Sequence, residues 1–197
     1  MYAEITPHHL AALSVRRAAD ALEQTEADPT TWFFVILDLH RALYCALIAA
    51  LSGSAGIGAY PDKLRVKWLD YFERSRTDPK AKAPTDDYVL SFGELLEKAE
   101  NSPLELQNSP LQLTSEQRTD ISKLNEFRGD LEHVKPRSWL LAVGGLPRMG
   151  ANAARAFAAL LPSFSYQLEP KEIDQVETAI AKFEQLGFKH PSSPPAP

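Results

Sequence analysis

The chain lacks the residues and spacings on which several common enzyme classes depend. Its 197 residues include a single cysteine, Cys45, so neither an intramolecular disulfide nor a cysteine metal cage can form. It also has no zinc-ligand spacing, no nucleophile turn of the serine hydrolases and no glycine-rich loop with the lysine of phosphate-binding enzymes. We therefore predict no metal and no cofactor. One thiol within an apolar run fits a reducing compartment best.

Signals for secretion or for a membrane span are lacking as well. The N-terminus has no basic region followed by an apolar core. The longest apolar run, residues 32–51, carries Asp38, His40 and Arg41 near its middle, where a bilayer would make charged side chains costly. We expect a cytoplasmic protein without a membrane span, in which this run is a core helix.

The composition is that of one soluble globular domain. Apolar residues make up 44% and charged residues 24% of the chain. We assign residues 1–188 to a single helical domain and residues 189–197 to a disordered tail rich in proline and serine. The net charge of -5 disfavours indiscriminate binding to polyanions.

Apolar side chains recur at steps of three and four residues along most of the chain, which predicts an all-α fold. Prolines and capping residues place helix starts near residues 7, 29, 61, 85, 114, 147 and 170. Thr85 is expected to cap the fourth helix, with Asp86 and Asp87 in its first turn. Gly187 is expected to stop the last helix.

A tandem duplication separates the fourth and fifth helices. NSPLELQ at residues 101–107 is nearly repeated by NSPLQLT at 108–114, and the proline in each copy disfavours a helix. We expect a loop held in place by its four leucines, Leu104, Leu106, Leu111 and Leu113.

Basic residues gather around the third helix although the chain as a whole is acidic. Residues 63–82 hold seven basic side chains against three acids, an excess of four. Lys63, Lys67, Arg74 and Arg76 are therefore candidates for phosphate contacts. A solvated helix face that runs into a charged loop explains the same pattern.

His40 is the polar residue that stands out on the apolar face of the helix expected at residues 32–51. Such a residue is most often a core histidine with a hydrogen-bond partner. The alternative is that His40 lines a cavity.

The one arrangement that looks chemical is LNEFRGDLEHVKPRSW, residues 124–139. Arg128 and His133 lie about 140° apart on an ideal helix, so a single regular helix does not build a site from both. His133 falls in the last turn before Pro136, where the helix can tighten or unwind, and Gly129 loosens it further.

The same residues can also be explained by structural roles alone, without catalysis. Arg128 and Glu132 are four residues apart and suited to an exposed ion pair. Asp130 lies three residues before His133 and could hold its ring.

The pattern Leu-Asn-x-Phe-Arg, then four residues and a histidine, then Lys-Pro and Trp, resembles the HEPN superfamily (higher eukaryotes and prokaryotes nucleotide-binding). The segments DLHRALYCAL and SFGELLEKA resemble other helices of that family, so the likeness spans about residues 30–185. It implies an up-and-down bundle of four to five long helices plus accessory helices. It also implies a homodimer that brings two motifs together.

In active members, the resemblance implies metal-independent RNA cleavage by a toxin or defence effector. His133 would then be the general acid or base and Arg128 would bind the phosphate, with Asp130 and Glu132 in support. Gly129 departs from the polar residue that the family usually has after the arginine, which puts cleavage in question. The alternative is a noncatalytic dimeric module that binds nucleotide, RNA or a protein partner such as an antitoxin.

Overall fold

The protein is an all-helical bundle, which confirms the predicted fold class. The computed structural model describes residues 5–104, 106–132 and 140–189, and within those ranges it contains no β-strand. Its α-helices are α1 (Pro7–Leu22), α2 (Trp32–Ser52), α3 (Asp62–Ser75), α4 (Phe92–Asn101), α5 (Ser115–Glu132), α6 (Leu146–Leu160) and α7 (Pro170–Lys189). Short 3-10 turns at residues 29–31, 143–145, 161–163 and 165–167 join some of them.

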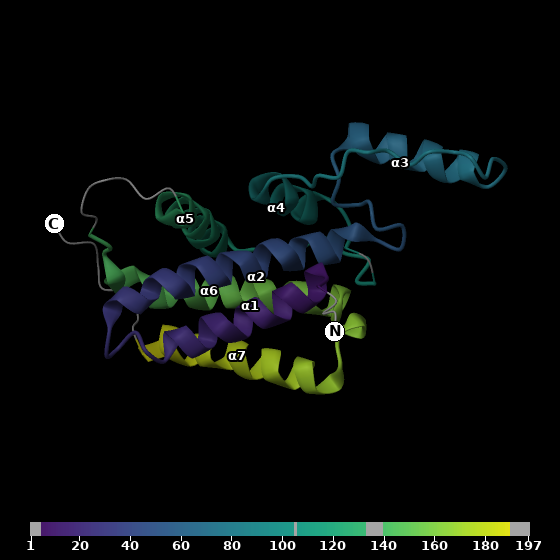
Figure 1. Cartoon of the computed structure of the whole chain (residues 1–197). Helices are drawn as coiled ribbons and strands as arrows, with labels where there is room; N and C mark the ends of the chain where they lie inside the picture. The colour runs from purple at the N-terminus through teal and green to yellow at the C-terminus, as the bar shows by residue number, and fades with distance from the viewer. Residues whose placement is uncertain (1–4, 105, 133–139, 190–197) are drawn as a thin grey trace.

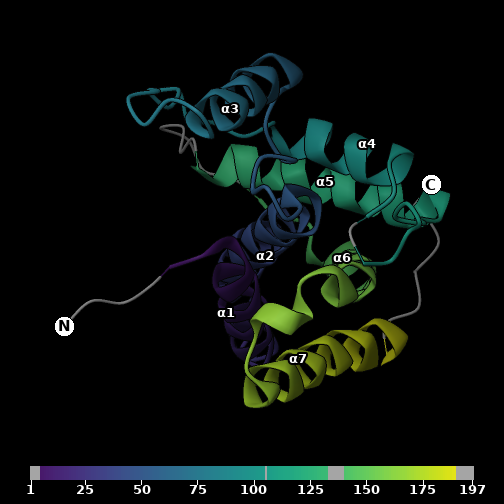
Figure 2. The same cartoon turned by 90° about the vertical axis from the view of Figure 1, so that its right-hand side faces the viewer.

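The central element is α2, which packs against α1, α4, α5 and α6 (Figure 1). Ile36, Leu43 and Leu47 are fully buried, as the apolar pattern predicts. By length and composition residues 29–52 could cross a membrane, but 61% of the most apolar window is buried inside the bundle. The place of α2 in the core therefore accounts for its hydropathy. A further helix, α7, covers α1 and α6 on the other side of the bundle (Figure 2).

Two predicted helix starts are confirmed by their caps. The Thr6 hydroxyl accepts a hydrogen bond from the backbone N–H of His9 ahead of α1. Thr114 and Gln117 form a reciprocal capping box at the start of α5, with bonds of 2.9 and 3.1 Å. These local bonds satisfy N–H groups that a helix leaves free in its first turn.

The predicted start of the fourth helix at Thr85 is wrong. The helix begins at Phe92, where Ser91 and Glu94 make the capping box. Asp86 and Asp87 lie ahead of it and bind elsewhere: Asp86 pairs with Lys67, and Asp87 accepts a hydrogen bond from Tyr60. These bonds tie the non-helical segment before α4 to α3 and to the loop before it, in place of a helical turn.

Gly187 does not stop the last helix, because α7 continues to Lys189. A Cβ atom at position 187 would lie 2.6 Å from the Cβ atom of Ala151 in α6. Glycine is needed here for the close approach of α7 to α6, and this explains its presence inside a helix.

Residues 102–104 and 106–114, the described part of this segment after α4, contain no helix, in agreement with the predicted loop. Leu104 and Leu111 are buried and Leu113 packs partly against the core. Leu106 is exposed and has a positive φ of 66°, so only three of the four leucines hold the loop as predicted.

One helix, α3, stands apart from the bundle as an arm (Figures 1 and 2). Leu64 is its one buried residue among those that the structure describes. Trp68, Tyr71 and Phe72 pack against one another on a half-buried face. The arm thus has a small aromatic core of its own.

Candidate functional site

A cleft of about 710 Å³ opens where α2, α4 and α5 meet. That volume lies in the range of roughly 300–1,000 Å³ typical of small-molecule sites. Polar, charged and apolar side chains all line it. The lining residues are Leu10, Leu37, His40, Arg41, Tyr44, Cys45, Ser91, Phe92, Gly93, Asn125, Arg128 and Glu132.

Helical spacing explains which side chains of α5 line the cleft. Asn125, Arg128 and Glu132 are three and four residues apart, so they share one face of the helix. Ile121 and Leu124 are buried in the core and fix which way this face turns. Arg128 therefore lies on the cleft.

His40 of α2 meets Asn125 of α5 across the cleft. His40 Nε2 donates a hydrogen bond of 2.9 Å to the amide oxygen of Asn125, and the His40 residue is only 6% exposed. Burial lowers the pKa of His40, while the Asn125 hydrogen bond raises it and the nearby Arg128 lowers it. The ring is therefore neutral at pH 7. His40 has a hydrogen-bond partner and also lines a cavity, so both readings of this residue are correct.

Arg128 lies at the mouth of the cleft in an ion pair with Glu132, 2.7 Å from guanidinium to carboxylate. This confirms the ion pair expected from their spacing. The two side chains are 40% and 38% exposed, so water and incoming ligands can reach both. Such a half-exposed pair contributes little to folding stability. An incoming anion can compete with Glu132 for the guanidinium.

Aromatic rings and a thiol complete the α2 and α4 side. The rings of His40 and Phe92 lie 4.5 Å apart, and Tyr44 lies 6.4 Å from each of them. Burial raises the pKa of Tyr44 and raises that of the Cys45 thiol to about 11. Cys45 is therefore an uncharged thiol at neutral pH and not an activated nucleophile.

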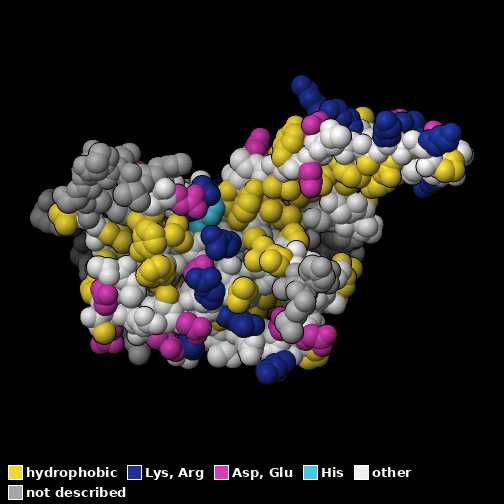
Figure 3. Space-filling view, viewed as in Figure 1, with side chains coloured by type: hydrophobic (Ala, Val, Ile, Leu, Met, Phe, Trp, Pro, Cys, Tyr) yellow, Lys and Arg dark blue, Asp and Glu magenta, His cyan; other side chains and the backbone are white. Residues whose placement is uncertain are grey.

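The basic candidates on α3 do not reach this cleft. Lys63, Lys67, Arg74 and Arg76 lie on the arm, where basic side chains gather (Figure 3), and none of them lines the cleft. Acidic neighbours pair with three of them: Asp86 with Lys67, Asp70 with Arg74, and Glu73 with Arg76. These ion pairs are those of a solvated charged face, and the phosphate contacts of this stretch stay a prediction.

Of the remaining residues of the 124–139 motif, the structure describes those up to Glu132 and not His133. Asp130 is exposed on α5, and a Cβ atom at Gly129 would meet nothing within 4 Å. His133 lies outside the described residues, as does its expected contact with Asp130. Glu132, the residue before it, lines the cleft.

Sequence reasoning missed the partnership of His40 and Asn125. The two residues are 85 positions apart, and periodicity along a single helix carries no information on which helices face each other. The one available signal was a histidine on an otherwise apolar helix face. Among the described residues no three His, Cys, Asp or Glu side chains form a group able to hold a metal ion.

Comparison of the chain with protein-family models, with curated proteins and with solved structures finds no match in any of the three.

Proposed function

We propose that this protein acts on RNA at the cleft between α2, α4 and α5, as a metal-independent endoribonuclease of the HEPN type. One observation carries the proposal. Arg128 presents a half-exposed guanidinium to a cleft of about 710 Å³, and polar side chains of α2 line the opposite wall. A toxin or defence effector that works in the cytoplasm as a homodimer, with an antitoxin or other protein as partner, fits this chemistry.

Each side chain has a distinct part in the proposed reaction. Arg128 binds the non-bridging oxygens of the scissile phosphate in place of Glu132 and offsets charge that develops there. His133 takes the proton of the ribose 2'-hydroxyl as that oxygen attacks phosphorus. The 5'-oxygen leaves and receives a proton from an acid, which in a dimer is His133 of the second chain.

RNA cleavage in the presence of a chelator tests this function. Wild-type protein is expected to cut mixed RNA, whereas Arg128→Gln and His133→Ala lose at least about a hundredfold in rate, the typical contribution of one acid–base or charge-stabilising group. Arg118→Gln, which removes another cation of α5 that pairs outside the cleft, is the matched control and is expected to cut normally. Equal cleavage by all variants, or intact RNA with wild type, would reject a nuclease.

A second candidate is a noncatalytic module that binds nucleotide, RNA or a protein through the same cleft. The observation that favours it is Gly129, where the resembling family usually has a polar residue and where this structure has open space. Because that space admits a side chain, Gly129→Asn can restore the family pattern without a clash. RNA that binds to wild type without cleavage, and is cut only by Gly129→Asn, would establish the binding module.

A further inference from the structure

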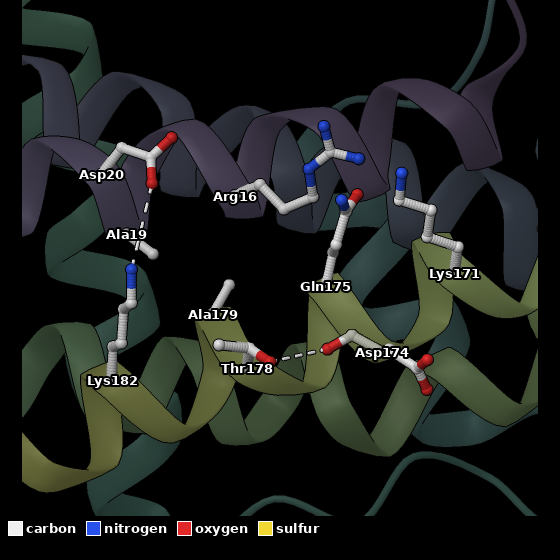
Figure 4. Close-up of a pocket in the computed structure, with 9 residues that line it drawn as sticks. All are labelled: Arg16, Ala19, Asp20, Lys171, Asp174, Gln175, Thr178, Ala179 and Lys182. Carbon is white, nitrogen blue, oxygen red and sulfur yellow. Dashed lines mark hydrogen bonds and ion pairs between the residues drawn. The ribbon is translucent and has the colours of Figure 1, made fainter.

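A second hollow lies on the opposite side of α2 from α4, between α1 and α7. It is a groove of about 430 Å³, separate from the Arg128 cleft, and no residue lines both. Ala19 and Ala179 form its floor where the two helices pack together (Figure 4). Their small side chains leave room for longer polar residues at the rim.

Three hydrogen-bond donors face one end of this groove. Figure 4 shows the guanidinium of Arg16, the amide of Gln175 and the ammonium of Lys171 turned toward the same space. Arg16 comes from α1 and is half-buried, while Lys171 and Gln175 come from α7. Among the described residues neither Arg16 nor Lys171 makes an ion pair. The carboxylate of Asp174, which also lines the groove, points away in the same view.

The other end of the groove is different. Lys182 lies 2.7 Å from Glu23 and 4.0 Å from Asp20, so its charge is already balanced. The groove therefore has one neutralised end and one end with two cations and an amide but no acid between them. An uncompensated pair of cations repels itself unless an anion joins it.

We propose that this end of the groove binds a phosphomonoester. A phosphate group offers three terminal oxygens, which matches three donor groups approaching from two helices. Arg16 supplies a planar fork suited to two of these oxygens, and Lys171 supplies a compact charge. A phosphomonoester also carries a charge of about -1.5 to -2 at pH 7, which balances the two cations, whereas a carboxylate carries a single negative charge.

The size of the groove favours an organic phosphate over the free ion. A volume of about 430 Å³ exceeds the space that the anion needs and lies in the range of small-molecule sites. The organic part of the ligand would extend along Ala19 and Ala179 toward the neutralised end. This site is independent of RNA cleavage at Arg128, since the two hollows share no residue.

Titration with glycerol 3-phosphate, followed through the methyl NMR signals of Ala19 and Ala179, tests the proposal. Saturable shifts of these signals are expected with the wild-type protein. Arg16→Gln or Lys171→Gln is expected to weaken binding about tenfold, because each removes a charged hydrogen bond. Lys182→Gln is the matched control within the groove and Arg128→Gln the control for the cleft; both are expected to bind within about twofold of wild type.

Four results would overturn the proposal. The first is the absence of saturation in the millimolar range. The second is equal weakening by Lys182→Gln, which would indicate diffuse attraction to surface charge. The third is an affinity for inorganic phosphate equal to that for glycerol 3-phosphate, which would show that the groove takes the bare anion. Shifts that vanish in Arg128→Gln alone would place the ligand in the cleft instead.

Discussion

The two halves of α5 use polar side chains in opposite ways. In the first half Asp120, only 1% exposed, accepts two hydrogen bonds of 3.1 Å from Arg148 and one of 2.7 Å from Asn152, both on α6. In the second half Asn125 and Arg128 face the cleft beside α2. The same helix therefore carries one polar network that is buried in the protein and another that faces the cleft.

The difference separates side chains that stabilise the fold from side chains that a ligand can reach. Hydrogen bonds within the protein satisfy the buried carboxylate of Asp120. This network therefore stabilises the packing of α5 on α6 and leaves no acceptor for a ligand. Around Arg128 the ion pair is half-exposed and a ligand can replace one partner. Substitutions in the Asp120 network should therefore lower the free energy of unfolding, and substitutions at Arg128 should lower it much less.

Asp120→Ala is expected to have the largest effect. Removal of the carboxylate leaves Arg148 and Asn152 without their buried acceptor, which should lower the free energy of unfolding by about 2–3 kcal/mol. The cost stays below that of a wholly buried pair, because the side chain of Arg148 is 36% exposed and also lies 3.5 Å from Glu116. Urea unfolding followed by circular dichroism measures it.

The comparison for this prediction is Arg118→Ala on the same helix. The side chain of Arg118 is 58% exposed and that of its partner Glu100 is 13% exposed, so the loss of this pair should cost about 1 kcal/mol, less than the loss of Asp120. Equal losses from Asp120→Ala and Arg118→Ala would contradict the view that the α6 network is the stabilising one.

A smaller, pH-dependent effect is expected at His40 on the cleft side. Burial lowers the pKa of His40 in the folded protein below its ordinary value of 6.5. As the pH falls through 6.5, the unfolded chain takes up the proton before the folded protein does. The contribution of His40 to the free energy of unfolding is therefore fully present above this pH and decreases below it. Wild type should therefore lose stability between about pH 7 and pH 5.

His40→Gln isolates this titration. Glutamine retains an amide that can reach Asn125 but has no proton to gain in this range. Its free energy of unfolding, measured by urea titration at each pH, should fall less than that of wild type between about pH 7 and pH 5. Parallel curves for the two proteins would show that the ring titrates alike in both states.

Much of the scaffold could be predicted from the sequence because helices are local. The apolar period marked α2, and the Thr114 and Gln117 pair marked the start of α5, since both depend on residues within one or two turns. The Thr85 prediction failed because Asp86 and Asp87 bind Lys67 and Tyr60, which belong to other segments. Gly187 was misread for the same kind of reason, since its neighbour is in α6.

The candidate site could be predicted only in part. Arg128 and its ion pair with Glu132 follow from a spacing of four residues. The wall opposite, with His40 bound to Asn125, depends on how α2 packs on α5 and has no local signature. The ion pair of Arg128 with Glu132 could therefore be predicted from the sequence, whereas the cleft that these residues line could not.

Gly129→Ala is expected to have the smallest effect, and one of opposite sign. Gly129 lies inside α5 with ordinary helical neighbours, and a Cβ atom there would contact nothing within 4 Å. Alanine should therefore raise the free energy of unfolding by about 0.5–1 kcal/mol through helix propensity alone. Gly150→Ala is the contrast, because its Cβ atom would lie 3.1 Å from the Phe183 ring. At Gly150 that contact should cancel the gain in stability that alanine gives through helix propensity. If Gly129→Ala instead lowers stability in urea unfolding, the second half of α5 is not the regular, lightly constrained helix on which the comparison with the Asp120 half depends.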